Sequence, residues 1–236
     1  MSDTYTWLVT GSNRGIGLEL VKQLVASSNN IVIATCRKPG SASALTELAS
    51  AAPGRLHIVA LDVSDGASIK ASVEPVKDVL ETHGLDYLVN NAATNNGEDS
   101  AFTFTEEILV RTLKANVVGP ALIAQAYLPY LEKGKRKVIM NLSTGLASIA
   151  SGYKDLLASY SISKTALNML TYKQATARPD IIAFVIDPGW VKTDMGGPNA
   201  VLETKDCVAG LLKIITSATT EQSGKYYGYD GQTIPW

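Results

Sequence analysis

Short, continuously apolar runs alternate with longer segments of helical period along this chain of 236 residues, and this alternation constrains the fold most strongly. The runs are rich in Val, Ile and Leu and lack the polar alternation of a half-exposed sheet, as expected for strands covered on both faces. We place them at 6–10, 31–36, 56–61, 87–90, 137–142, 181–186 and 225–229. This pattern is typical of βαβ units and predicts an α/β protein with a doubly wound, mostly parallel seven-stranded sheet.

Helical periodicity occupies the intervals between these runs. We expect helices at about 16–26, 42–50, 69–82, 105–131, 159–177 and 204–217. The Gly- and Pro-rich stretch 188–198 lies between a strand and a helix, so we interpret it as a loop. No shift of composition marks a boundary, and the chain is therefore predicted to form one domain over residues 1–236.

Composition narrows the class of protein. Hydrophobic residues make up 46% and charged residues 18%, with 21 basic against 22 acidic side chains. These values argue against a disordered chain and against a polybasic nucleic-acid binder. The two cysteines, Cys36 and Cys207, form neither a disulfide framework nor a zinc spacing. The first residues lack the pattern of a signal peptide and no apolar stretch has membrane-spanning length, so we expect a cytoplasmic protein without membrane contact.

A glycine turn follows the first strand directly. The order of the turn is Thr10-Gly11-Ser12-Asn13-Arg14-Gly15-Ile16-Gly17, and apolar residues at helical spacing follow it. Glycines permit a tight turn and a close approach of the backbone, and the amides at a helix start favour a phosphate. This strand, turn and helix predict a dinucleotide site in a Rossmann fold, although the bare motif also occurs as an ordinary turn.

The acid that an NAD site usually places about 20 residues beyond the glycines is missing. No Asp or Glu occurs between Glu19 and Glu47, and the second strand ends in Cys36-Arg37-Lys38. A cation there accommodates a 2′-phosphate, and Arg14 could add a second positive charge. We therefore predict NADP(H) as the cofactor; the alternative for Arg37 and Lys38 is a solvated loop.

Further motifs appear in a specific order. They are Asp62-Val63, Asn90-Asn91-Ala92-Ala93, Asn116, Asn141-Leu142-Ser143-Thr144, Tyr160-Ser161-Ile162-Ser163-Lys164, Asp187-Pro188-Gly189 and the tail from Gly224 to Trp236. Together with the glycine turn, they resemble the short-chain dehydrogenase/reductase family in its compact branch, and the tail looks like that of the sniffer and C-factor carbonyl reductases. The resemblance covers essentially the whole chain.

Tyr160 and Lys164 lie four positions apart, which places them on one face of a helix. A phenol titrates near 10, and a neighbouring ammonium together with an oxidised nicotinamide favours the phenolate. We expect this pair to bring the phenol toward the range useful for acid/base chemistry. The resemblance assigns the same roles: Tyr160 as proton donor, Lys164 on the nicotinamide ribose, and Asn116 supporting a proton relay through water.

The position after the fifth strand departs from the family pattern. Members commonly carry Ser-Ser, and the second serine polarises the substrate carbonyl, whereas this chain has Ser143-Thr144. A threonine hydroxyl makes the same hydrogen bond. The interval to Tyr160 is a few residues longer than in most members, so Ser143 stays as the alternative to Thr144.

The resemblance also implies a set of cofactor contacts along the carboxyl ends of the strands. The predicted cofactor-binding residues are Gly11, Ser12, Asn13, Arg14, Gly15, Ile16, Gly17, Arg37, Asp62, Val63, Asn91, Ala92, Ala93, Tyr160, Lys164, Pro188, Gly189, Val191 and Thr193. Asp62 could instead cap a helix. His57 and His83 lack ligand spacing, and no metal is predicted.

The resulting expectation is an NADPH-dependent carbonyl reductase, reversible as an alcohol dehydrogenase. Segments 94–100, 145–157 and 190–200, which would form the substrate pocket, carry only Lys154 and Lys192 as basic residues, so we expect a small uncharged carbonyl or alcohol. The alternative is a non-catalytic NADP(H)-sensing regulator, since a fold does not fix a function. A sugar-nucleotide epimerase needs a further domain that 236 residues do not accommodate. The oligomeric state stays open: many relatives form a homodimer or a homotetramer, and some carbonyl reductases of this kind are monomers.

Overall fold

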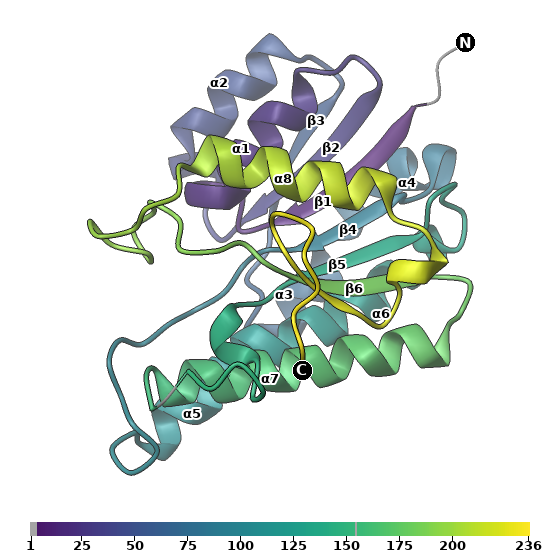
Figure 1. Cartoon of the computed structure of the whole chain (residues 1–236). Helices are drawn as coiled ribbons and strands as arrows, with labels where there is room; N and C mark the ends of the chain where they lie inside the picture. Colours follow the sequence, from purple (N-terminus) through teal and green to yellow (C-terminus); the bar gives the residue numbers. More distant parts are fainter. Residues whose placement is uncertain (1–3, 154) are drawn as a thin grey trace.

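All seven strands lie in one parallel sheet in the computed structural model, which describes residues 4–153 and 155–236. The strands are β1 (Tyr5–Thr10), β2 (Asn30–Cys36), β3 (Leu56–Ala60), β4 (Tyr87–Asn90), β5 (Val138–Leu142), β6 (Ile182–Asp187) and β7 (Tyr226–Gly228). Their order is β3-β2-β1-β4-β5-β6-β7 (Figure 1). The predicted doubly wound fold is confirmed, and every strand pairing is parallel.

The strand order reverses direction at β1, which pairs with β2 on one side and with β4 on the other. The connection that leaves β1 passes through α1 on one face of the sheet, and the connection that leaves β4 passes through α6 on the opposite face. In sheets of this kind a crevice lies beyond the carboxyl ends of the two strands. Ligands of open α/β sheets bind at such a point. The glycine turn after Thr10 and the segment after Asn90 flank it.

Helices cover both faces of the sheet, and two separate cores result (Figure 1). One face packs against α1 (Gly15–Val25), α2 (Ser43–Ala51) and α8 (Thr204–Ser217). The other packs against α3 (Gly66–Ala71), α4 (Lys77–His83), α6 (Gly119–Leu131) and α7 (Ala158–Ala177). The alternation of neighbouring strand residues, such as Val9 and Leu8, between the two cores explains why the strands are apolar throughout.

Two of the predicted helices are interrupted. The segment predicted at 69–82 divides into α3, a 3₁₀ turn (Glu74–Val76) and α4, because Pro75 has no amide hydrogen for a continuous helix. The segment predicted at 105–131 begins as α5 (Glu106–Leu113), widens into a π-helical turn, η3 (Lys114–Val118), and continues as α6. Asn116 lies inside this π turn, a feature that often accompanies a functional site.

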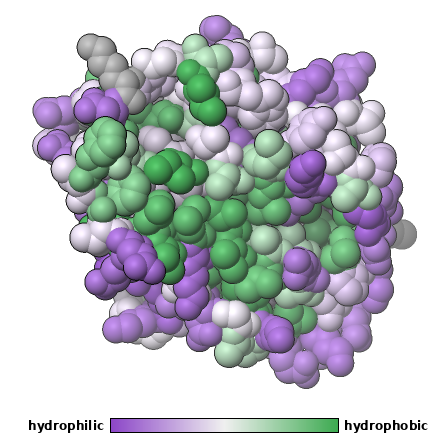
Figure 2. All heavy atoms as spheres, turned by 90° about the horizontal axis from the view of Figure 1, so that it is seen from below, coloured by the Kyte–Doolittle hydropathy of each residue, from purple (hydrophilic) through white to green (hydrophobic). Residues whose placement is uncertain are grey.

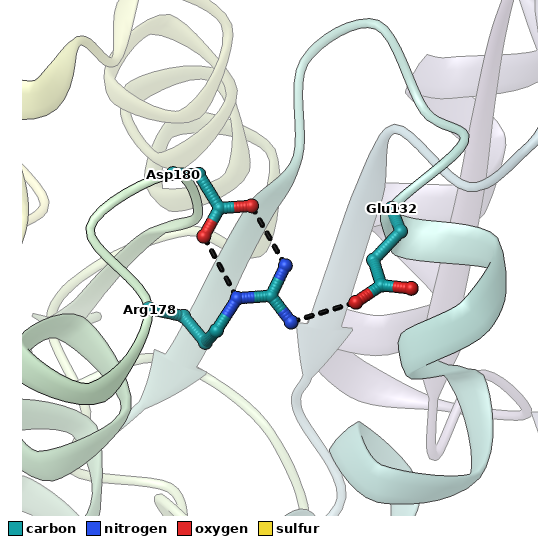
Figure 3. A network of polar contacts seen from close by, with 3 residues as sticks. All are labelled: Glu132, Arg178 and Asp180. Carbon is teal, nitrogen blue, oxygen red and sulfur yellow. Dashed lines mark hydrogen bonds and ion pairs between the residues drawn. The ribbon is translucent and has the colours of Figure 1, made fainter.

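An ion-pair cluster fixes the end of α7 that lies away from the crevice (Figure 3). Arg178 donates to both carboxylate oxygens of Asp180, at 2.8 and 2.7 Å, and to Glu132 after α6 at 2.7 Å. The Arg178 hydrogen bonds lower the pKa of Asp180 to about 2. The cluster joins the carboxyl ends of α6 and α7 across the entry to β6.

The underside of the molecule, on the side of α5 and α7, presents a broad apolar surface (Figure 2). Exposed apolar side chains of α5, η3 and α7 are Val110, Val118, Ile162, Met169 and Tyr172. Within the described residues, no helix has the length and apolar character that crossing a bilayer requires.

Candidate active site

The glycine turn is held tightly beneath the crevice. The Ser12 amide donates to Thr35 O at 2.9 Å, and its buried hydroxyl donates to Val9 O at 2.7 Å. Gly11 adopts a φ of +68°. A Cβ at Gly17 would lie 2.2 Å from Gly11 O, a distance that no side chain permits. Glycine is therefore required for α1 to start this close to β1.

Asn91 joins the glycine turn to the segment after β4. Its side-chain amide donates to Thr10 O at 2.8 Å, and the backbone amides of Asn91 and Ala92 both donate to the Thr10 hydroxyl at 3.0 Å. A Cβ on Gly11 would lie 2.9 Å from the Cα of Ala92. The side chains of Thr10 and Asn91 thus hold the glycine turn against the segment after β4.

These residues fit the phosphates of a dinucleotide. Helix α1 begins at Gly15, and the preceding residue, Arg14, makes no side-chain hydrogen bond to cap it. The first amides of the helix are therefore available to an anion, and the dipole of α1 favours one. Among the other predicted residues, Asn13 and Ile16 lie in this turn, Val63 follows β3 and Ala93 follows β4.

Arg37 and Asp62 lie together beyond the ends of β2 and β3. A hydrogen bond from Ser64 is the main cause that lowers the pKa of Asp62, with burial opposing it and the charges of Arg37 and Lys114 contributing. The Asp62 Oδ1 accepts from Ser64 N at 2.9 Å, while Asp65 caps α3 through Ala67 N. Asp62 is therefore not the helix cap, and Arg37 is exposed at the position where we expect an adenosine ribose.

Arg14 forms an ion pair with the loop after β6 in this structure. Its guanidinium binds Asp194, in the loop after β6, at 2.7 Å, and both side chains are largely exposed, at 67% and 74%. A Cβ on the adjacent Gly15 would lie 3.3 Å from Thr193 Cγ2, so this loop closes over the glycine turn. An exposed ion pair contributes little to stability, about 0 to 1 kcal/mol, and exchanges readily for another anion.

Tyr160 and Lys164 share one buried face of α7. The Lys164 Nζ lies 5.8 Å from the centre of the Tyr160 ring and donates to Leu142 O, at the end of β5, at 2.7 Å. The two residues are only 9% and 2% exposed. The predicted helical spacing therefore brings them together as expected.

Burial is the largest cause of the pKa shift of both groups. Burial lowers the pKa of Lys164 to about 7, so its side chain is partly uncharged at neutral pH. Burial and, second, the charge of Asp187 raise the pKa of Tyr160 above its usual value of 10. The lowering of this pKa beside an ammonium and an oxidised nicotinamide stays a prediction; in this structure burial is the largest cause of the shift. A phenol in this environment retains its proton at neutral pH.

The two hydroxyls after β5 occupy different environments. Ser143 is buried, and its Oγ donates to Asn168 Oδ1 on α7 at 2.7 Å. Thr144 is only partly buried, and its Oγ1 makes one weak contact, with Leu146 N at 3.4 Å. The Thr144 carbonyl accepts a hydrogen bond from the phenol of Tyr226. Thr144 therefore has the free hydroxyl of the two.

Asn116 is completely buried in η3 and all of its amide groups are paired. Its Oδ1 accepts from Thr94 N at 2.8 Å, and its Nδ2 donates to Thr94 O and Ser163 Oγ, both at 2.9 Å. Asn116 thus links the segment after β4 to Ser163 of α7, the residue that precedes Lys164.

The turn after β6 forms the remaining wall. The Gly189 amide donates to Asp187 Oδ1 at 3.1 Å, and Cys207 Sγ contacts Pro188 O at 3.3 Å. Val191 is buried and Thr193 receives the amide of Gly196 at 3.1 Å. The predicted loop at 188–198 is confirmed. Within the described residues, no group of three or more His, Cys, Asp and Glu is placed to hold a metal ion.

Comparisons with known proteins agree with this geometry. The family model for short chain dehydrogenases matches residues 6–201. The chain belongs to the short-chain dehydrogenase family. A crystal structure of an NADPH-bound carbonyl reductase from chicken fatty liver is 36% identical to it, covers 100% of both chains and superimposes with a TM-score of 0.94.

Two further relatives support the same grouping. The carbonyl reductase Sniffer of D. melanogaster is 30% identical over 99% of this dehydrogenase and 100% of its own chain, with a TM-score of 0.93. A norsolorinic acid ketoreductase from Aspergillus parasiticus is 31% identical over 98% of this chain and 90% of its own. The predicted resemblance to short-chain dehydrogenases and to sniffer-like carbonyl reductases is confirmed, and the protein is an oxidoreductase.

Three polar residues of this dehydrogenase site were not singled out from the sequence. They are Thr94, which pairs with Asn116, Asn168, which pairs with Ser143, and Tyr226, which pairs with Thr144. The position of Asn168, four residues beyond Lys164 on the same helix face, was the one available signal. Nothing local to Thr94 or Tyr226 indicates a partner so distant in the sequence.

Proposed function

We propose that this dehydrogenase is an NADPH-dependent carbonyl reductase that also runs in reverse as an alcohol dehydrogenase. The observation that supports the proposal is that Lys164, four residues after Tyr160 on α7, binds the end of β5 directly before the free hydroxyl of Thr144. A free hydroxyl and a protonated phenol are the groups that the reduction of a ketone or aldehyde requires from the protein.

NADPH, when bound, supplies the hydride that adds to the carbonyl carbon. The glycine turn and the first amides of α1 would hold its pyrophosphate, with Asp62, Val63, Asn91, Ala92 and Ala93 along the adenosine side. The exposed guanidinium of Arg37 would bind the 2′-phosphate. The NADPH-bound chicken enzyme supports this cofactor assignment.

Each catalytic side chain has a distinct role. Thr144 donates a hydrogen bond to the carbonyl oxygen and polarises it. Tyr160, whose raised pKa keeps it protonated, gives its proton to the same oxygen as negative charge develops there, which completes the alcohol. Lys164 orients the nicotinamide ribose and lies against the Tyr160 ring. Because the Asn116 amide is fully paired, we assign it the support of the proton relay rather than proton transfer itself.

The substrate is proposed to be small and uncharged. Of the two lysines in the pocket-forming segments, Lys192 forms an ion pair with Glu203, and Lys154 lies outside the described residues. Trp190, Met195 and Tyr153 are each about half exposed in these segments and offer apolar contact area. This lining favours a carbonyl compound over a phosphate ester.

We further propose a homo-oligomer through the apolar underside (Figure 2). The exposed apolar side chains of this surface on α5, η3 and α7 are Val110, Val118, Ile162, Met169 and Tyr172. Patches of this kind mark association sites. Sedimentation of the wild type against Met169→Lys tests the assignment, which predicts a smaller species for the variant.

The function itself is tested by Tyr160→Phe. We expect this change to abolish turnover and to leave the Kd of NADPH within a few-fold, because the hydroxyl acts mainly in the transition state. Tyr172→Phe, an exposed position on the same helix, is the matched control and should retain full activity. Substantial kcat in Tyr160→Phe would contradict the role of this phenol.

A further inference from the structure

The C-terminal tail lies against the segment that leads from β5 to α7 (Figure 1). The Ser148 hydroxyl donates to Pro235 O at 2.6 Å, and the Ala150 amide donates to Trp236 O at 3.1 Å. This segment begins at Thr144 and forms one of the expected walls of the substrate pocket. The tail therefore holds a pocket wall by its backbone, at a point far away in the sequence.

Tyr226 on β7 connects the tail to Thr144. Its ring stacks on that of Trp236, with the ring centroids 5.6 Å apart and the planes inclined by 29°, and its carbonyl accepts the Ile234 amide at 2.8 Å. The Tyr226 hydroxyl donates to Thr144 O, and the side chain lies in a residue that is only 1% exposed. A phenol that is buried and stacked has little freedom, so its hydroxyl fixes the position of the carbonyl it binds.

The Thr144 carbonyl lies at the point where the chain leaves the sheet. The Ser143 amide still donates to Ile186 O at 2.8 Å, which continues the pairing of β5 with β6. Thr144 is extended, at φ −162° and ψ 147°, and a 3₁₀ turn follows, in which the Ala147 amide donates to Thr144 O at 2.9 Å. That bond lies within the turn itself, whereas the Tyr226 hydroxyl holds the same carbonyl from outside.

We propose that Tyr226 is a positioning residue for carbonyl reduction, because its hydroxyl fixes the Thr144 peptide and thereby the Thr144 Oγ1 that polarises the substrate. A β-branched side chain has few rotamers, so a displaced Thr144 backbone displaces the hydroxyl with it. The C-terminal tail supports this role by holding the Tyr226 ring through Trp236. The inference rests on the proposed function of the Thr144 hydroxyl.

Tyr226→Phe removes the hydroxyl and retains the ring that stacks on Trp236. We expect kcat for carbonyl reduction to fall about 10- to 100-fold, because misplacement of a catalytic group by about 1 Å costs on the order of 100-fold. The Kd of NADPH and the KM of the carbonyl compound should stay within a few-fold, since the lost interaction acts in the transition state.

The Thr144→Val background separates positioning from a general structural effect. This background lacks the hydroxyl that Tyr226 positions, so Tyr226→Phe should lower its kcat by less than about twofold. A loss of equal size in both backgrounds, or no loss in the wild-type background, overturns the proposal. Normal turnover by Thr144→Val alone would instead overturn the proposed function of this hydroxyl, and the two failures are therefore distinguishable.

Tyr127→Phe is the matched control for the loss of a buried phenol. The Tyr127 hydroxyl donates to Ser72 O at 3.0 Å, between α6 and the end of α3. This variant should have a lower free energy of unfolding and an unchanged kcat, and a comparable loss of kcat there overturns the proposal. If Tyr226→Phe does not fold, Trp236→Ala carries the test: it should lower kcat, Trp236→Phe should restore it, and full activity of Trp236→Ala overturns the proposal.

Discussion

At the scale of a residue, the burial of Lys164 reduces the free energy of unfolding whenever its side chain is charged. A lysine in an almost fully buried position, with burial lowering its pKa to about 7, is costly in its charged form. Its folded pKa lies below the unfolded value, so its contribution to stability is fully present above pH 10.5 and is lost as the pH falls through about 7.

Replacement of Lys164 by Met should therefore raise the thermal stability. At pH 6 the wild type carries the charge in the folded state, and the variant avoids a cost of a few kcal/mol at most, less the penalty for the unpaired Leu142 O. We expect a higher Tm for Lys164→Met at pH 6, a smaller difference at pH 9, and loss of turnover. A lower Tm at both pH values would contradict this assignment of the burial cost.

The two hydroxyls after β5 give a second prediction at this scale. Because Thr144 has the free hydroxyl, Thr144→Val should lower kcat/KM by about 100-fold or more, and Thr144→Ser should be tolerated. Ser143→Ala removes the partner of a buried amide, so its main cost should be about 1 to 3 kcal/mol of unfolding free energy. Steady-state kinetics and denaturant unfolding of the three variants distinguish the roles, and the opposite ranking would transfer the polarising role to Ser143.

At the residue scale, the sequence predicts how side chains are spaced on a helix but not which groups surround them in the fold. The i to i+4 relation of Tyr160 and Lys164 is fixed by helix geometry alone, so it could be predicted. The directions of their pKa shifts depend on burial and, for Tyr160, also on Asp187, which lies 27 positions beyond it by subtraction. No local pattern contains that information.

Among the elements, the π turn η3 is the least predictable and the most consequential. It places Asn116 where one side chain satisfies both backbone groups of Thr94 and also reaches Ser163. The periodicity of 105–131 indicates one helix, since a single extra residue in a turn leaves the apolar pattern almost unchanged. Tertiary partners, rather than local propensity, select the π geometry here.

Asn116→Ala should release the segment after β4. Both backbone groups of Thr94, which are partly buried, lose their partners, so we expect faster proteolytic cleavage within residues 94–104 and a strong loss of kcat, with the fold retained. Gln125→Ala, exposed on α6, is the matched control. An unchanged cleavage pattern in the Asn116 variant would show that the segment is held by other contacts.

At the scale of an element, we expect the end of β2 to set the preference for NADPH over NADH. A phosphate facing one guanidinium is worth roughly 1.5 to 3 kcal/mol, so NADPH should exceed NADH at least tenfold in kcat/KM. Cys36→Asp combined with Arg37→Ser should invert this preference, because a carboxylate at the strand end repels the phosphate and binds free ribose hydroxyls. Equal use of both cofactors by the wild type would contradict the placement of Arg37.

At the scale of the whole molecule, the continuous apolar strands and the right-handed connections of βαβ units determine most of the architecture. The seven strands and the loop at 188–198 were predicted from the apolar runs and from the Gly and Pro content, and the structure confirms them. The closure of the loop after β6 onto the glycine turn, through Arg14 and Asp194, could not be predicted. Exposed ion pairs between distant segments leave no periodic signal in a sequence.

The most direct test of the account is the oxidation of NADPH by the wild-type protein in the presence of a panel of small ketones, aldehydes, diketones and quinones. We predict that loss of NADPH absorbance is accompanied by one equivalent of the corresponding alcohol or reduced product, and that Tyr160→Phe binds NADPH but forms none. Tight NADPH binding by the wild type without turnover of any carbonyl compound would contradict a reductase and indicate a protein that senses the cofactor.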